Sequence, residues 1–206
     1  MSKIIYLIQS LQTSERLIYI NKNLQTFPDL QIFKSINGYD INETTNELLN
    51  SNIIYHTLEK EYVTYGTLAN FLTKVNAFKY QVKNNIEYMC LIEDDLILND
   101  NFKDFIENLL PLLQDCNMLR LSKWGEGYVT SLEGAKQILN HIYKKGIINN
   151  IDNQLRLYCG KEIHINNTPF YLCVDTNCGD CLKTKYISDE EVLKFKSIKP
   201  LTIPVF

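Results

Sequence analysis

The sequence predicts an α/β fold in which helices flank a mostly parallel central sheet. Patterns typical of a strand, a helix and a second strand follow one another within residues 4–36, and this order is the usual opening of a parallel sheet. A helical pattern over residues 65–82 then leads directly into an apolar strand, and strand and helix patterns alternate again beyond it. With 206 residues and 45% hydrophobic composition, the chain can bury the core of one such domain.

The first three elements are defined by apolar spacing and by turn residues. Residues 4–8 form an apolar run that predicts a buried strand. A helix follows, because apolar residues repeat at helical spacing after Thr13 and Ser14, either of which can cap the first turn, and Pro28 closes the segment. Residues 30–36 alternate like a second strand.

The middle of the chain contains a polar excursion and then the most unusual strand. Residues 40–61 are polar and weakly periodic, so at most short helices are expected there. The helix over residues 65–82 precedes the apolar stretch 88–100, which contains three consecutive acids. Asp100 is expected to cap the next helix, which ends close to Pro111.

Two further strands and two helices complete the regular part of the chain. The strands are expected at residues 118–122 and 128–130. Ser131 can cap the helix that follows, and Asn150 can cap a shorter helix over residues 151–158. The sequence therefore predicts one domain over residues 1–165, with an irregular C-terminal segment, residues 166–206, packed on it.

Charge and hydropathy narrow the class of protein. A net charge of −3 and scattered basic residues give no electrostatic footprint for nucleic acid. No apolar run approaches the roughly 18 residues that a transmembrane helix needs, and the N-terminal run has no cleavage site of the signal-peptide type. We expect a soluble, cytoplasmic protein with reduced cysteines; the sequence does not indicate its oligomeric state.

Glu93, Asp94 and Asp95 interrupt the apolar strand and form the first candidate site. Carboxylates are costly to bury unless they are paired or bind a metal, and ligands of α/β proteins usually bind at the carboxyl ends of the strands. In an extended strand, Glu93 and Asp95 would point the same way and Asp94 the opposite way. The alternative is a solvated junction between strand and loop.

Four stretches, in order along the chain, resemble glycosyltransferase family 25, the lipooligosaccharide and procollagen galactosyltransferase group. They are residues 4–16 (IIYLIQSLQTSER), 33–38 (FKSING), 91–96 (LIEDDL) and 127–135 (GYVTSLEGA). Asp152 falls where the family has an aspartate before a short helix. The resemblance implies a GT-A-like nucleotide-sugar-binding fold and transfer of a hexose from a nucleotide donor.

We expect a role in this transfer for each of the three acids Glu93, Asp94 and Asp95. A divalent cation held by carboxylates neutralises charge on a leaving diphosphate, and Mn²⁺ or Mg²⁺ prefers oxygen ligands. We expect Asp95 to be the main metal ligand, Glu93 to assist it, and Asp94 to bind the sugar or ribose of the donor.

Donor contacts are expected at Arg16, Gly66, Thr73 and Lys74. Arg16, at a helix start, suits a diphosphate, and the alternative for both Arg16 and Lys74 is a surface salt bridge. The stretch 66–74 keeps the first glycine of a family pattern but has Thr73 for a serine. It also has Thr67 and Lys74 in place of an acid and a histidine. Lys74 can hold a diphosphate as a point charge but cannot act as a neutral histidine.

Asp152 and Glu126 are the candidate general bases for the acceptor hydroxyl. The alternative for Asp152 is stabilisation of a helix dipole. Trp124, near Glu126, could stack on a sugar or pack in the interior.

The predicted function is transfer of a hexose, galactose or glucose, from a UDP-sugar to a hydroxyl of a glycan or protein, assisted by a metal. One alternative is an inactive glycosyltransferase-like binding domain. The other is a small interaction protein stabilised by zinc on Cys173, Cys178, Cys181 and His164. Cys90 and Cys116 are expected in the core.

Overall fold

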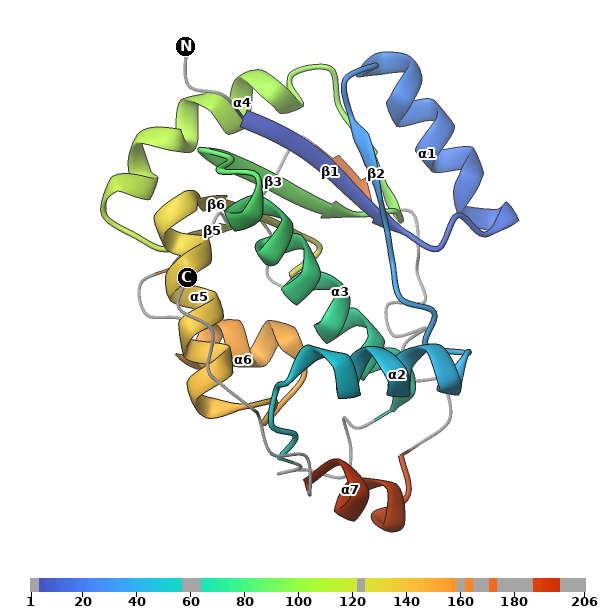
Figure 1. The fold of residues 1–206 in the computed structure, drawn as a ribbon. Coiled ribbons are helices and arrows are strands. Elements are labelled where there is room, and N and C mark those ends of the chain that lie inside the picture. The colour runs from blue at the N-terminus through green and yellow to red at the C-terminus, as the bar shows by residue number, and fades with distance from the viewer. Residues whose placement is uncertain are drawn as a thin grey trace. The chain divides into compact units, whose positions relative to one another are not determined.

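The computed structural model describes residues 4–56, 64–121, 125–158, 162–164, 171–173 and 187–196. The strands are β1 (Ile4–Ser10), β2 (Gln31–Lys34), β3 (Tyr88–Glu93), β4 (Leu96–Leu98), β5 (Met118–Arg120), β6 (Gly127–Ser131), β7 (Glu162–His164) and β8 (Tyr171–Cys173). The helices are α1 (Ser14–Thr26), α2 (Ile41–Ser51), α3 (Tyr65–Lys83), α4 (Phe102–Leu109), the 3₁₀ helix η2 (Leu110–Gln114), α5 (Leu132–Lys145), α6 (Ile151–Tyr158) and α7 (Asp189–Lys196). The predicted α/β class is confirmed (Figure 1).

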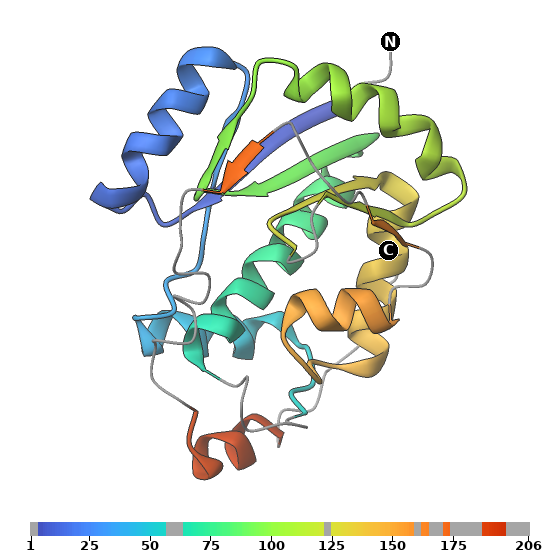
Figure 2. The same cartoon turned by 180° about the vertical axis from the view of Figure 1, so that it is seen from behind.

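Six strands form one mixed sheet in the order β2-β1-β3-β6-β5-β7. The β1 strand pairs in parallel with β2 and β3, and β5 pairs in parallel with β7. Only β6 runs against its neighbours, β3 and β5, so the expectation of a mostly parallel sheet is confirmed. A second, two-stranded sheet joins β4 to β8, the orange arrow beside the sheet in Figure 2.

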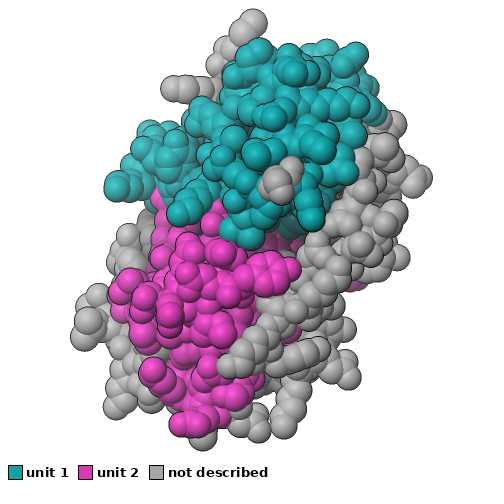
Figure 3. Space-filling view, turned by 90° about the vertical axis from the view of Figure 1, so that its right-hand side faces the viewer, with its two compact units in different colours: residues 1–34, 80–135, 160–178 teal, residues 35–79, 136–159, 179–206 magenta. Residues whose placement is uncertain are grey.

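The chain divides into two compact units (Figure 3). Unit 1 comprises Met1–Lys34, Tyr80–Ala135 and Gly160–Cys178, and it contains both sheets. Unit 2 comprises Ser35–Lys79, Lys136–Cys159 and Gly179–Phe206. The division of the sequence at residues 165 and 166 stays a prediction.

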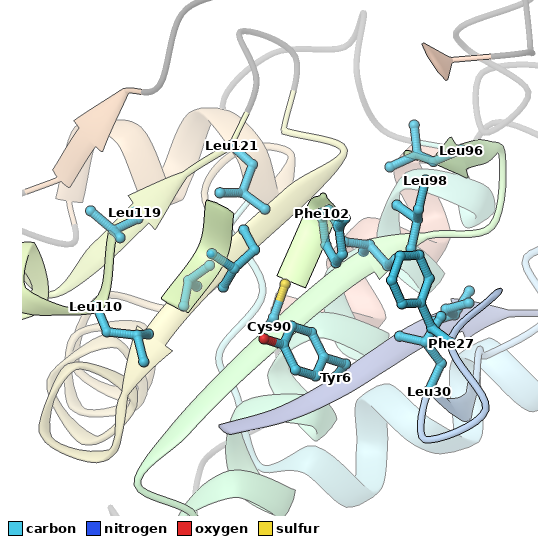
Figure 4. Packing of buried hydrophobic residues seen from close by; sticks show 14 of the residues in the cluster. Tyr6, Phe27, Leu30, Cys90, Leu96, Leu98, Phe102, Leu110, Leu119 and Leu121 are labelled. Carbon is cyan, nitrogen blue, oxygen red and sulfur yellow. The ribbon is translucent and has the colours of Figure 1, made fainter. Parts of the chain in front are cut away.

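The core of unit 1 lies between one face of the large sheet and the helices α1, α4 and η2 (Figure 4). Alternate residues of β1 and of β3 point into it, as a period of two requires. Its buried members include Tyr6, Ile8, Ile20, Phe27, Cys90, Ile92, Leu98, Phe102, Ile106, Leu119, Leu121 and Val129. The sheet that carries the acids is therefore firmly supported on this face.

Unit 2 has its own buried residues and includes the C-terminal helix α7. Apolar side chains from α2, α3, α5 and α6 are buried, among them Leu48, Phe71, Val75, Phe78, Ile138, Ile142 and Leu155. The Tyr65 hydroxyl donates to Glu191 Oε1 at 2.7 Å. The ring centroids of Tyr55 and Phe195 lie 5.5 Å apart in an edge arrangement. These contacts attach α7 to the rest of unit 2.

The α2 helix was missed by the sequence reasoning. An 11-residue helix lies in the stretch where at most short helices are expected. Its N-cap is Asp40, which accepts from the Glu43 amide at 3.0 Å. Few of its residues are buried, Leu48 among them, so the apolar period is too weak to detect.

The helix caps are partly as predicted. Asn150 and Ser131 accept hydrogen bonds from first-turn amides of α6 and α5. The expected Asp100 cap is wrong, because the N-cap of α4 is Asn101, and no capping bond comes from its side chain. Thr13 is the N-cap of α1, also without a side-chain capping bond. None of the helices within the described ranges has the length and apolarity to cross a membrane.

Candidate active site

The three acids lie where β3 ends and the chain turns into β4. Glu93 is the last residue of β3, and Asp94 and Asp95 form the turn; we call these three residues the acidic turn. Because β1 and β3 are parallel and adjacent, their carboxyl ends meet, and Gln9 is the register partner of Glu93. The Glu93 amide also donates to the carbonyl of Glu126 at 2.9 Å. The acids therefore lie at the carboxyl ends of parallel strands, where ligands of α/β proteins usually bind.

The end of β1 supplies two partners for the acidic turn that sequence reasoning missed. Gln9 Nε2 donates to Glu93 Oε1 at 3.3 Å. The buried Ser10 hydroxyl donates to Asp94 Oδ2 at 2.5 Å and accepts from the Gln12 amide at 2.7 Å. Gln12 has a positive φ of 55°, so this hydrogen bond helps to hold an uncommon backbone conformation. The only sequence signal was the position of both residues at the end of a strand parallel to β3.

Arg16, in the first turn of α1, faces the acidic turn. Its Nε lies 3.8 Å from Asp94 Oδ1, and its Nη1 lies 3.8 Å from Asp95 Oδ2. Both distances exceed those of a hydrogen bond, so these are loose ion pairs. The expected alternation of the acids is wrong, since Asp94 and Asp95 both approach the same guanidinium. The physical reason is that these residues form a turn and do not continue the extended strand.

Asp95 is a buried carboxylate of the acidic turn. Asp95 is 8% exposed. Its Oδ1 atom is buried and has no hydrogen-bond partner among the residues that the structure describes. Burial, followed by the negative charge of Glu93, raises the pKa of Asp95 from 3.8 to about 7, although Arg16 opposes this shift. A buried carboxylate with an unused oxygen is suited to bind a cation.

Asn23 fixes the strand that leaves the acidic turn. This residue of α1 is buried, and its carboxamide donates to the Leu96 carbonyl at 2.7 Å and accepts from the Leu98 amide at 2.9 Å. The α1 helix therefore contacts the acidic turn through Arg16, near its start, and contacts β4 through Asn23, further along. Local sequence patterns gave no sign of this connection.

Lys74 and Asp152 form an ion pair within unit 2. Lys74 Nζ lies 2.9 Å from Asp152 Oδ1, and the two side chains are 1% and 26% exposed. Asp152 is in the first turn of α6, after the Asn150 cap. The geometry thus brings together a residue predicted to hold the donor and a residue predicted to act as a base.

Other predicted donor contacts in unit 2 also have structural partners. Thr73 Oγ1 donates to the Ala69 carbonyl at 2.8 Å and accepts from the Ile36 amide at 3.0 Å. Gly66 packs so closely on Gly38 that a Cβ on Gly38 would lie 2.5 Å from the Gly66 Cα. Gly66 therefore has a role in close packing, and Thr73 has a role in hydrogen bonding within the protein. Both roles are separate from the donor contacts predicted for these residues.

Some of the remaining candidates lie in the described part of the structure. The buried Glu126 immediately precedes β6 in unit 1, whereas Trp124 lies outside the described residues. Cys90 and Cys116 are buried free thiols, as expected. The proposed zinc ligands, Cys173, Cys178, Cys181 and His164, have side chains outside the described part of the structure.

The acidic turn does not by itself complete a coordination shell. Within the described ranges, no group of three or more His, Cys, Asp or Glu side chains is arranged to hold a metal ion. A cation on Asp95 would therefore need further oxygen ligands, from water or from a bound molecule such as a phosphate.

The chain matches glycosyltransferase family 25, described as LPS biosynthesis protein, over residues 3–154. Because the match covers most of the chain, this protein belongs to that family, and the resemblance found in the sequence is confirmed. The family and the α/β architecture identify the fold as GT-A-like and support a role in glycosyl transfer. No curated protein matches the chain.

Several solved structures are similar to this one. They include a protein described as a nucleotide-diphospho-sugar transferase from Desulfovibrio desulfuricans G20, with 11% identity, 81% of this chain and 80% of that chain covered, and a TM-score of 0.42. A glycosyltransferase involved in glycosylation of the major capsid of PBCV-1 has 10% identity, 88% and 98% coverage, and a TM-score of 0.46. A cytidylyltransferase from Leptospira borgpetersenii has 12% identity, 81% and 77% coverage, and a TM-score of 0.39. The family assignment rests on the sequence match.

Proposed function

We propose that this protein transfers a hexose, galactose or glucose, from a UDP-sugar to a hydroxyl of a glycan or protein acceptor, with Mn²⁺ or Mg²⁺ as cofactor. Family membership supports the glycosyl transfer. The observation that carries the metal-dependent part is Asp95, a buried carboxylate with one oxygen unused at the end of β3. Its ionised form is disfavoured in the protein alone, and a cation would reverse that preference.

Asp95 and Glu93 would hold the metal, with the phosphates of the donor as further ligands. The metal, when bound, supplies Lewis-acid stabilisation of the leaving diphosphate. Asp94, whose carboxylate is oriented by Ser10, would accept a hydrogen bond from the ribose or the sugar of the donor. Arg16 would add a bidentate contact to the diphosphate.

The base that deprotonates the acceptor hydroxyl is proposed to be Asp152, with Glu126 as the second candidate. Asp152 is a partly exposed carboxylate held by the Lys74 ammonium, and a fixed orientation is what a general base requires. Gly66, Thr73 and Lys74 remain proposed donor contacts.

Calorimetric titration of Mn²⁺ in the presence of UDP tests the metal site. Asp95→Asn removes the charge at nearly constant shape, and we expect Mn²⁺ affinity to fall at least about tenfold, or about 1.4 kcal/mol. Asp100→Asn is the matched control, because this exposed acid lies just beyond β4. Equal Mn²⁺ binding by the wild type and Asp95→Asn would show that Asp95 is not a metal ligand.

A thermal-shift screen of UDP-, GDP- and CMP-sugars, with and without Mn²⁺, tests the donor. A ligand that binds only the folded state raises its stability, so the largest shift is expected for a UDP-hexose with Mn²⁺. A larger shift for a GDP- or CMP-sugar would correct the donor assignment.

A second candidate is a domain that binds a nucleotide sugar or a glycan without turnover. It is favoured by the structural roles of the two departures from the family pattern. Thr67 exchanges hydrogen bonds with Thr64 at the start of α3, and Lys74 is paired with Asp152. Transfer or donor hydrolysis that is detected with a panel of nucleotide sugars, and is lost in Asp95→Asn, would exclude this candidate.

A further inference from the structure

We propose that Arg16 exchanges partners: it pairs with the acidic turn when no donor is bound, and moves to the diphosphate when the donor arrives. Arg16 would then couple metal binding to donor binding. This inference rests on the proposed function and adds to it a specific order of charge pairing.

The geometry of Arg16 favours exchange over a fixed structural contact. Its ion pairs with Asp94 and Asp95 are 3.8 Å long, and its side chain is 19% exposed. The neighbouring contact from Ser10 to Asp94, in contrast, is a 2.5 Å hydrogen bond by a buried hydroxyl. Long, partly solvated ion pairs contribute little stability, so the cost of leaving them is small. Asp94 keeps its Ser10 partner when Arg16 departs.

The charges also favour exchange. Arg16 is a single positive charge that lies within 4 Å of two carboxylates. Its charge therefore weakens the attraction of these carboxylates for a divalent cation. A diphosphate is a stronger bidentate partner for a guanidinium than one oxygen from each of two carboxylates at this distance. The donor therefore brings a new partner for Arg16 and, at the same time, leaves the carboxylates to the metal.

The position of Arg16 on α1 allows it to serve both partners. The residue is in the first turn, where its own amide bonds back to the Thr13 carbonyl at 3.0 Å. Further along the helix, the buried Asn23 bonds to β4 on both sides of Ile97. The helix is thereby fixed, and only the Arg16 side chain has to rotate.

Coupling of this kind has a reciprocal consequence. The factor by which UDP tightens Mn²⁺ binding must equal the factor by which Mn²⁺ tightens UDP binding, and such factors are typically about 5 to 150. Direct coordination of Mn²⁺ by phosphate contributes to the factor in every variant. The contribution of Arg16 is distinguished by how its substitution changes the affinity for Mn²⁺ alone and the affinity for UDP alone.

The test is calorimetric titration of Mn²⁺ alone and of UDP alone in the wild type and in Arg16→Gln. We expect Arg16→Gln to bind Mn²⁺ alone more tightly, by roughly threefold to tenfold, because a competing cation has been removed. It should bind UDP alone more weakly, on the order of tenfold, because a bidentate phosphate contact is lost. Opposite shifts for the two ligands are the signature of a shared residue.

Two further variants separate charge from geometry. Lys22→Gln removes one positive charge from an exposed position on the same helix, and neither affinity should change. Arg16→Lys keeps the charge but lacks the planar fork, so Mn²⁺ affinity should stay near the wild-type value while UDP affinity falls. Thermal unfolding of each variant verifies that it is folded.

The outcomes are distinguishable. Weaker or unchanged Mn²⁺ binding by Arg16→Gln would overturn the exchange and make Arg16 a fixed part of the acidic turn. Unchanged UDP binding by the same variant would also overturn it. If the wild type binds no Mn²⁺ even with UDP present, the metal-dependent function itself fails, and the exchange fails with it.

Discussion

Asp95→Asn is expected to make the metal-free protein more stable at pH 8 while it removes the proposed metal site. Burial and the charge of Glu93 raise the pKa of Asp95 from 3.8 to about 7. A carboxyl whose pKa is raised on folding stabilises the folded state while it is protonated in both states. That contribution is lost as pH rises from about 4 through about 7.

The magnitude follows from that pKa. Each pKa unit corresponds to about 1.4 kcal/mol, so ionised Asp95 opposes folding by up to about 4 kcal/mol above pH 7. Asn keeps the shape and loses the charge, but it also loses the loose pair with Arg16 at 3.8 Å. We therefore expect a net gain of about 1 to 3 kcal/mol at pH 8, or roughly 2 to 10 °C in Tm for a chain of this size.

Urea unfolding of the metal-free wild type and Asp95→Asn, at pH 8 and at pH 4, measures this difference. The gain should be large at pH 8 and should shrink towards zero at pH 4, where the wild-type carboxyl is protonated. Asp100→Asn, at an exposed position, should be neutral at both pH values. If Asp95→Asn is no more stable than the wild type at pH 8, then burial does not disfavour the Asp95 charge, and the argument for a cation at this residue is refuted.

Three further substitutions test other parts of the structure, each by urea unfolding. Asp152→Asn leaves the buried Lys74 ammonium without the Asp152 carboxylate and should cost about 2 to 4 kcal/mol; the double variant with Lys74→Met should recover part of this loss, and an equal loss in both would argue against the pair. Gly38→Ala would place a Cβ 2.5 Å from the Gly66 Cα and should cost about 1 to 3 kcal/mol through overpacking; a neutral result would mean that the two backbones can separate freely. Asn23→Ala leaves two main-chain groups of β4 without the carboxamide and should cost about 1 to 3 kcal/mol, whereas a loss below about 0.5 kcal/mol would show that water replaces it.

The sequence predicted those parts of the structure that depend on local patterns. The strand that ends at Glu93, the caps at Ser131 and Asn150, and the placement of Arg16 at a helix start all follow from neighbours within a few residues. The family resemblance added the GT-A-like fold, which hydrophobic periodicity alone could not distinguish from other α/β folds.

The missed features depend on distant contacts or on weak periodicity. Ser10 meets Asp94 from 84 residues away, and no spacing rule connects two strand ends before the strand order is known. The acids also depart from strand alternation, because Asp94 and Asp95 belong to a turn. The α2 helix was not predicted because it buries few apolar side chains, so its apolar period is weak.

The Asn23 carboxamide has a consequence for the behaviour of the protein in solution. A carboxamide has the same donor and acceptor as a peptide group, so its two bonds to β4 reproduce what one residue of a neighbouring strand would provide. A short strand with open main-chain groups is a template for pairing with another chain. By satisfying these groups from within a helix, Asn23 protects β4 against intermolecular strand pairing next to the acidic turn. A single side chain thus occupies two main-chain groups of β4 that would otherwise be open to pairing with a strand.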